Sequence, residues 1–181
     1  IYSRKIVGWE VYDRESGDDA AELLERSVWS EKVIKSQVIL HSDNGSPMKS
    51  YTLRAKMEEL GVVRSYSRPS VSNDNPYSES LFRTVKYHPR WPSEGFESLD
   101  AARTWVKDFV QWYNHEHRHS RIKFVTPVQR HTGEDKTLLA RRDKLYTRMK
   151  KSNPTRWSRK TRNWQHEQEV ALNPKHQKEA A

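Results

Sequence analysis

Cysteine is absent from this 181-residue chain, and only 34% of its residues are hydrophobic. The absence of cysteine excludes disulfides, thiolate catalysis and cysteine-ligated zinc, and it is typical of proteins from a reducing compartment. No apolar run approaches the roughly 20 residues that span a bilayer, and residues 1–7 mix charges with β-branched side chains where a secretory signal would be apolar. We therefore expect neither secretion nor membrane insertion.

Positive charge is concentrated at one end of the chain. The 33 Lys and Arg residues exceed the 24 Asp and Glu residues by nine, yet residues 1–135 contain 20 of each kind. The whole excess lies in residues 136–181, with 13 basic and 4 acidic side chains. Such a block favours a polyanionic partner, most commonly nucleic acid, through counterion release. A solvated, partly disordered tail has the same composition, so charge alone leaves both interpretations open.

Hydrophobic periodicity predicts that strands and helices alternate. Two-residue alternation and β-branched runs indicate strands, and apolar residues at helical spacing indicate helices with end signals such as Ser50 and Gly61. Two later helices are expected, one after the N-cap Thr126 with Pro127 in its first turn and a basic one beyond Glu134. This order indicates an α/β sheet with helices on its faces. The other predicted elements are strands over 3–13, 38–41 and 62–66, and helices over 18–29, 50–60, 77–87 and 100–117.

Two carboxylates occupy positions that are typical of ligand-binding or catalytic residues. Asp43 directly follows the apolar strand 38–41, and ligands gather at the carboxyl ends of strands in open sheets. Glu79 lies 35 intervening residues later, near the start of a predicted helix. The spacing is weak support, because Asp143 and Glu179 share it. Taken singly, Asp43 is also explained as part of an Asp-Asn-Gly turn, and Glu79 as a first-turn carboxylate on a helix dipole.

Lys86 follows Glu79 by seven residues, which is two helical turns, so both side chains share one helix face. A metal-binding carboxylate beside a phosphate-binding cation is what a nuclease-like site requires. Mg²⁺ prefers hard oxygen ligands, and two ions about 4 Å apart can stabilise the attacking and leaving oxygens of a phosphoryl transfer. The simpler explanation of Lys86 is a solvated surface lysine.

Longer motifs make the chain similar to a known family. The integrase-core transposases of bacterial insertion sequences, relatives of retroviral integrases, resemble SRKIVGW (3–9), HSDNGSPM (41–48), SRPSVSNDNPYSESLFRTVKYHP (67–89) and WYNHEHRHS (112–120) with Thr126-Pro127. The resemblance implies an RNase H-like fold, a DD(35)E triad, two bound Mg²⁺ or Mn²⁺ ions, and the cutting and joining of DNA ends. It also implies a homo-oligomer that holds transposon ends and target DNA, in the bacterial cytoplasm at the nucleoid.

Residue by residue, the resemblance implies that Asp43 and Glu79 are the second and third catalytic, metal-binding carboxylates. Lys86 then contacts DNA phosphate, Asn44 and Gly45 shape the turn of Asp43, and Asn75 caps or orients the helix of Glu79.

The resemblance also implies an absence. In the family the first catalytic Asp stands on a first strand, and a second strand follows before the segment that matches residues 3–9. Since the chain begins with Ile and with that segment, we expect a fragment: an incomplete core over residues 1–132 that lacks two strands and binds one ion weakly at most, and a basic helical extension over 133–181. We expect this piece to be inactive alone. Alternatives are a non-catalytic DNA-binding or assembly remnant and a Mg²⁺-dependent nuclease that does not join DNA.

The extension offers candidate DNA contacts in which cations alternate with Trp157 and Trp164. The two tryptophans either stack on bases or anchor the extension to the core, and both interpretations stay open. The candidate cations are Arg156, Arg159, Lys160 and Arg162.

Three histidines, His115, His117 and His119, raise the possibility of a zinc site. Residues two and four apart on a helix do not all face one ion. We therefore expect packing around Trp112 and Tyr113, with His119 and Ser120 shaping the turn that follows.

Overall fold

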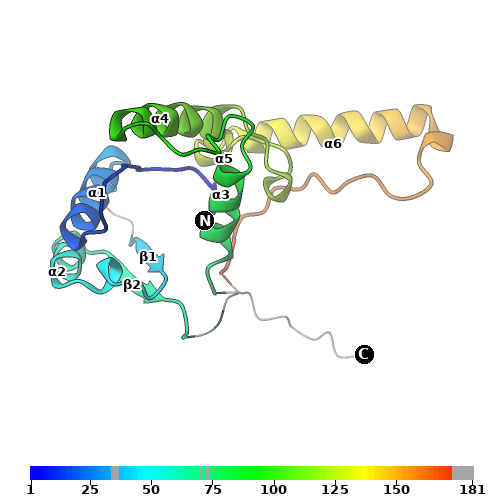
Figure 1. Ribbon diagram of the computed structural model, residues 1–181. Coiled ribbons are helices and arrows are strands. Elements are labelled where there is room, and N and C mark those ends of the chain that lie inside the picture. Colours follow the sequence, from blue (N-terminus) through cyan, green and yellow to red (C-terminus); the bar gives the residue numbers. More distant parts are fainter. Residues whose placement is uncertain (34–36, 70, 72–73, 173–181) are drawn as a thin grey trace. The chain divides into compact units, whose positions relative to one another are not determined.

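The computed structural model describes residues 1–33, 37–69, 71 and 74–172 (Figure 1). The chain divides into two compact units. The strand unit comprises Val7–Lys107 together with Leu172–Ala181, of which only Leu172 is described. The helical unit comprises Ile1–Ile6 and Asp108–Ala171. No helix within the described part of the chain is long and apolar enough to cross a membrane.

The strand unit is built on a parallel pair of strands, β1 (Ile39–Ser42) and β2 (Val63–Tyr66), as the hydrophobic pattern predicted. They pair in register from Ile39 opposite Val63 to Ser42 opposite Tyr66, and they form the one sheet found among the described residues. Because parallel strands end at the same edge, residues that follow β1 and β2 are brought together there.

Two predicted helices are confirmed beside these strands, α1 (Gly17–Ser30) and α2 (Tyr51–Glu59) (Figure 1). Ser50 caps α2 by accepting the Leu53 N–H, and Gly61 adopts a positive φ of 66° just beyond its end. The apolar faces of both helices meet in a core of Ala21, Val28, Leu53, Met57 and Val62.

The loop after β2 leads into α3 (Pro76–Lys86), and α4 (Leu99–His115) follows. Both helices agree with the predicted ranges to within two residues at each end. Pro76 starts α3, where its missing N–H costs nothing.

The predicted strand over residues 3–13 is wrong, because this segment forms no ladder with any described strand. Its backbone is instead bonded to a side chain: the Ile6 N–H donates to Asn114 Oδ1 and Asn114 Nδ2 donates to the Ile6 carbonyl, both at 2.9 Å. A buried asparagine thus satisfies the two groups that a neighbouring strand would pair.

The helical unit contains α5 (Pro127–His131) and α6 (Asp135–Ser152) around a small core. Thr126 and Gln129 form a reciprocal capping box, which confirms the predicted start after Thr126. After η4 (Pro154–Arg156) the chain runs back along α6 (Figure 1). The core residues are Ile122, Val125, Leu139 and Trp164.

The expected α/β class is therefore confirmed, with few strands. The expected domain boundary between residues 132 and 133 stays a prediction, since the two compact units divide the chain by contacts and not by family. Glu179 and the end of the expected extension lie outside the described residues.

Candidate carboxylate site

Asp43 and Glu79 line the same open pocket of the strand unit, with a volume of about 600 Å³. Asp43 comes directly after β1, and Glu79 is the fourth residue of α3. Both side chains are exposed to solvent. The sheet edge and the start of α3 therefore bring together two acids that are separated by 35 residues.

The turn of Asp43 is held from two directions. Asp43 Oδ1 accepts the Gly45 N–H at 3.0 Å, and Asn44 Nδ2 donates to the Ser67 carbonyl at 2.8 Å. Since Ser67 directly follows β2, the Asn44 amide ties the turn after β1 to the end of the neighbouring strand. The prediction that Asn44 and Gly45 shape this turn is confirmed.

Glu79 lies in the first turn of α3, where the unpaired backbone N–H groups of the helix favour negative charge. Asn75 occupies the N-cap position, and its carbonyl accepts the Glu79 N–H at 3.3 Å. Its side chain makes no capping hydrogen bond. Asn75 therefore starts the helix through its backbone, and its amide, which lines the pocket, is available there.

Sequence reasoning missed a clamp between Arg68 and Asp74 that brackets the loop before α3. The Arg68 guanidinium donates to both oxygens of the Asp74 carboxylate at 2.9 Å, and the Arg68 backbone N–H donates to Oδ2 at 2.8 Å. These hydrogen bonds, the guanidinium ones first, lower the pKa of Asp74 to about 2. Asp74 therefore stays ionised at neutral pH and keeps its ion pair with Arg68.

His41 joins the sheet to the same loop. Its Nδ1 lies 2.9 Å from Ser65 Oγ on β2, and its Nε2 lies 2.9 Å from the Asp74 carbonyl oxygen. The imidazole thus connects β1, β2 and the residue that Arg68 holds. His41, Arg68 and Asp74 all lie inside the motifs quoted above, but spacing alone gave no signal of which side chains would pair.

The donor set of the pocket fits a hard divalent cation. Asp43 and Glu79 provide carboxylate oxygens, and Asn44, Asn75 and Ser67 add amide and hydroxyl oxygens to its lining. Across the described ranges no cluster of three His, Cys, Asp or Glu side chains is present, so two carboxylates are what this part of the chain supplies. Two carboxylates in an open site suit one weakly held ion better than two.

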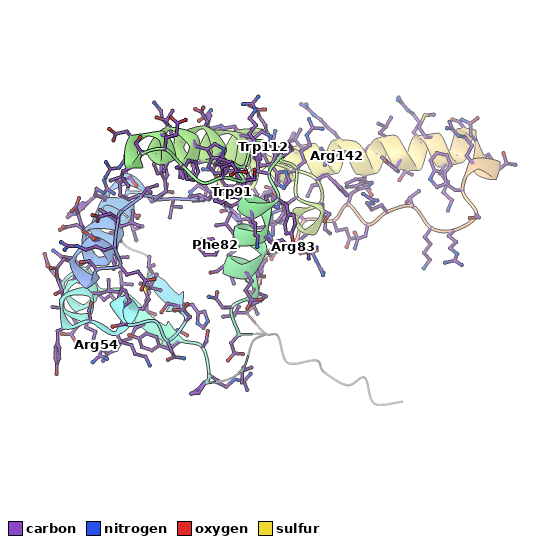
Figure 2. All side chains as sticks on the ribbon, in the orientation of Figure 1. Arg54, Phe82, Arg83, Trp91, Trp112 and Arg142 are labelled. Atoms are coloured by element: carbon purple, nitrogen blue, oxygen red, sulfur yellow. The ribbon has the colours of Figure 1, made fainter. Side chains whose placement is uncertain are left out.

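Lys86 is exposed at the end of α3, two turns beyond Glu79. Within the described chain its ammonium group makes no hydrogen bond or ion pair, so it is available to an anion. Phe82, which lines the pocket, lies between Glu79 and Lys86 on the same helix (Figure 2).

The candidate DNA-binding cations of the extension belong to the helical unit, whereas the carboxylates belong to the strand unit. All four are exposed, namely Arg156, Arg159, Lys160 and Arg162. The Arg162 guanidinium lies 4.6 Å from the Phe124 ring centroid and 5.7 Å from that of Trp164.

Trp164 is 5% exposed and packs against Tyr146 and the core of the helical unit, with ring centroids 5.2 Å apart. The anchor interpretation is therefore confirmed for Trp164. Trp157 is half-buried and stays open to either interpretation.

Two of the three histidines near the end of α4, His117 and His119, pack as expected, whereas His115 is exposed. The rings of His117 and His119 meet edge to face at 4.2 Å, and Tyr113 contacts both. Burial, then the neighbouring His117, lowers the pKa of His119 to about 4. The His119 carbonyl also accepts N–H groups of the following turn, which confirms its predicted structural role.

Two family models match the chain, over residues 1–72 and 60–127, and both describe an integrase core domain. Together they run without a gap over the strands, the carboxylate pocket and the turn before α5. Residues 1–127 therefore belong to the integrase core domain family. The curated proteins that the chain resembles are named as transposases of insertion sequences.

One relative is the transposase InsF for insertion sequence IS3A of Escherichia coli K12, 28% identical over 130 residues, which are 71% of this chain and 44% of that protein. Another, from Mycobacterium tuberculosis strain CDC 1551 / Oshkosh, is named as a transposase for insertion sequence element IS986/IS6110 and is 27% identical over 135 residues, 71% of this chain and 48% of its own length. The chain thus spans about half the length of the curated relatives it matches. Among solved structures, the catalytic core domain of BIV integrase aligns with a TM-score of 0.46 and 18% identity, over 71% of this chain and 78% of that one.

Proposed function

We propose that this chain contributes Asp43 and Glu79 to a metal-dependent phosphoryl-transfer site that cuts and joins DNA strands in transposition. The observation that supports the proposal most is that the two carboxylates line one pocket at the carboxyl end of β1. Membership of the integrase-core family supports the same chemistry and an RNase H-like fold. In such a fold Asp43 and Glu79 are the second and third acids of the catalytic triad.

Asp43 and Glu79 would hold the Mg²⁺ or Mn²⁺ ions, two of them in the intact protein. A bound divalent cation lowers the pKa of the attacking water or hydroxyl and neutralises the charge on the leaving oxygen. The protein's own contribution is positioning: the Asn44 bond fixes the turn of Asp43, and the Arg68–Asp74 clamp fixes the approach to Glu79. Lys86 supplies a cation for a neighbouring phosphate.

The partner is DNA, both the element ends and the target, held by a homo-oligomer. In the helical unit, the exposed cations Arg156, Arg159, Lys160 and Arg162 would bind the DNA backbone, each adding to the salt dependence of affinity. With two carboxylates in the site, this chain by itself would be inactive in DNA joining.

The test is a strand-joining assay with pre-cut DNA ends and Mg²⁺ in a transposase of its relatives' length that carries this chain. Glu79→Gln should abolish joining, because it removes a metal-binding charge, while DNA affinity stays nearly unchanged. Glu58→Gln, which changes an exposed acid of α2 in the same unit, is the matched control. Joining that survives Glu79→Gln would show that the site is elsewhere.

A non-catalytic DNA-binding or assembly role is the second candidate. The observation that favours it is the lack, in the described part of the chain, of a third acid beside Asp43 and Glu79. The same assay separates the two roles. DNA binding with full joining by the Glu79→Gln variant supports the non-catalytic role for this pocket.

A further inference from the structure

Phe82 is a large apolar side chain that is 69% exposed and lines the carboxylate pocket. It stands three residues after Glu79 and four before Lys86, so the carboxylate, the phenyl ring and the ammonium group lie along one face of α3. At 1.5 Å per residue, the Cα atom of Phe82 is about 4.5 Å from that of Glu79 and about 6 Å from that of Lys86 along the helix axis.

Packing within the described chain does not explain this phenylalanine. The half-buried apolar side chains of α3, Leu81 and Val85, are four residues apart, and Phe82 stands at the edge of the stripe that they form. Among the described residues no aromatic ring stacks on Phe82. A single exposed apolar side chain is common on protein surfaces. What sets Phe82 apart is that it shares a pocket with two acids.

We propose that Phe82 is a stacking platform for an unpaired DNA base beside the phosphate that this pocket binds. The inference rests on the proposed function, because that function places a DNA strand here. Every base has a flat π-face, and stacking on an aromatic side chain is tolerant of sequence. The flanking groups suit a nucleotide: Lys86 is exposed one turn further along α3, and the Arg68 side chain, which lines the same pocket and is ion-paired with Asp74, is 71% exposed.

The stacking role specifies which DNA the site binds, whereas phosphoryl transfer alone specifies only that the substrate is DNA. A base inside a duplex has both faces covered by its neighbours, so a base must leave the stack before Phe82 can receive it. The site should therefore prefer DNA whose strand is unpaired at the reacting position, such as a frayed or mismatched end, over fully paired DNA. Lower unpairing cost is the physical source of that preference.

The test uses the full chain, Mg²⁺ and a single-stranded oligonucleotide that contains the fluorescent base 2-aminopurine. Binding of the unaltered chain should quench the fluorescence through stacking. Phe82→Ala should remove the quenching and weaken affinity by about 5- to 140-fold, the range that follows from removing one stacking ring. Phe82→Trp should retain both the quenching and the affinity of the unaltered chain. Trp29→Ala is the matched control, since Trp29 on α1 is also 69% exposed in the same unit.

An oligonucleotide with an abasic site at the stacked position shows whether the ring contacts a base. On that DNA the unaltered chain and the Phe82→Ala variant should bind equally. If Phe82→Ala binds the 2-aminopurine strand as the unaltered chain does, while Glu79→Gln still abolishes joining in the longer transposase, the stacking role is wrong and the proposed function stands. If the unaltered chain binds no single-stranded DNA, the stacking role falls, whereas joining by the longer transposase tests the function separately.

Discussion

Arg68 holds both carboxylate oxygens of Asp74 with its guanidinium, each at 2.9 Å, and also donates its backbone N–H to one of them at 2.8 Å. Two residues six apart in the sequence thereby close the loop that joins β2 to α3. The carbonyl of the same Asp74 is bonded to His41 on β1. The clamp therefore connects the strand that positions Asp43 to the helix that carries Glu79.

Breaking the clamp should loosen the pocket. Arg68→Ala leaves the Asp74 carboxylate without its cation, so the separation between the turn of Asp43 and the start of α3 should become broadly distributed. The chain has no cysteine, so spin labels on cysteines introduced at the exposed Ser46 and Ser80 measure this separation by pulsed electron resonance. The distance distribution should be narrow in the labelled parent and wide after Arg68→Ala.

Arg64→Ala is the matched control, because Arg64 is an exposed arginine on β2 in the same unit. Its distance distribution should match that of the labelled parent. Equal widths for the two arginine variants would show that the clamp does not set the pocket's geometry.

The positions of Asp43 and Glu79 were predictable because both depend on local signals. An apolar strand followed by Asp-Asn-Gly places the first, and a proline-started helix places the second. The clamp was not predictable, because Arg68 and Asp74 are two ordinary charged residues in a polar loop until the chain folds. Pairing of polar side chains across a loop has no periodicity that a sequence can show.

Asn114 should make a large contribution to the free energy of unfolding. It is 6% exposed and satisfies both backbone groups of Ile6. Asn114→Ala should lower the free energy of unfolding by about 2 kcal/mol, because it leaves buried polar groups unpaired. Urea titration and hydrogen exchange of the Ile6 amide measure the effect. The control Gln111→Ala, at an exposed site on α4, should cost little; equal losses would contradict the bracing role.

The error over residues 3–13 has the same origin as the missed clamp. The β-branched and aromatic residues of that segment have strand propensity, but propensity becomes a strand only when a neighbouring strand pairs with it. The neighbour of Ile6 is an asparagine side chain, 108 residues away in the sequence. Helices, whose hydrogen bonds are local, were predicted more accurately.

Trp164 should behave as a core residue. Its indole fills the core of the helical unit beside Leu139 and Tyr146. Trp164→Ala should therefore lower the free energy of unfolding by about 3–5 kcal/mol. The half-buried Trp157, replaced by alanine, should cost clearly less. Thermal or urea unfolding followed by circular dichroism measures both, and a larger loss for Trp157→Ala would reverse the assignment of the anchor.

Protonation of His119 should lower the free energy of unfolding in mild acid. Burial lowers the pKa of His119 from 6.5 to about 4 in the folded chain, so between these values the unfolded chain binds a proton that the folded chain does not. The free energy of unfolding should then decrease as the pH falls from about 6.5 to about 4. Asp74, with a pKa of about 2, loses its contribution to the free energy of unfolding only at lower pH.

His119→Phe should flatten the dependence of stability between these pH values, as measured by urea titrations at several pH values. His115→Phe, at an exposed position near the end of α4, is the control. If His119→Phe leaves the slope unchanged, another group controls stability in this range.

The central claim, that Asp43 and Glu79 hold one cation together, is tested most directly by titrating the chain with Mn²⁺ and recording paramagnetic broadening of amide resonances. The Gly45 and Ser80 amides, next to the two acids, should broaden at the same Mn²⁺ concentration, and Glu79→Gln should abolish both effects while Glu58→Gln leaves them intact. Broadening at one amide only, or broadening at both that persists after Glu79→Gln, would contradict the account.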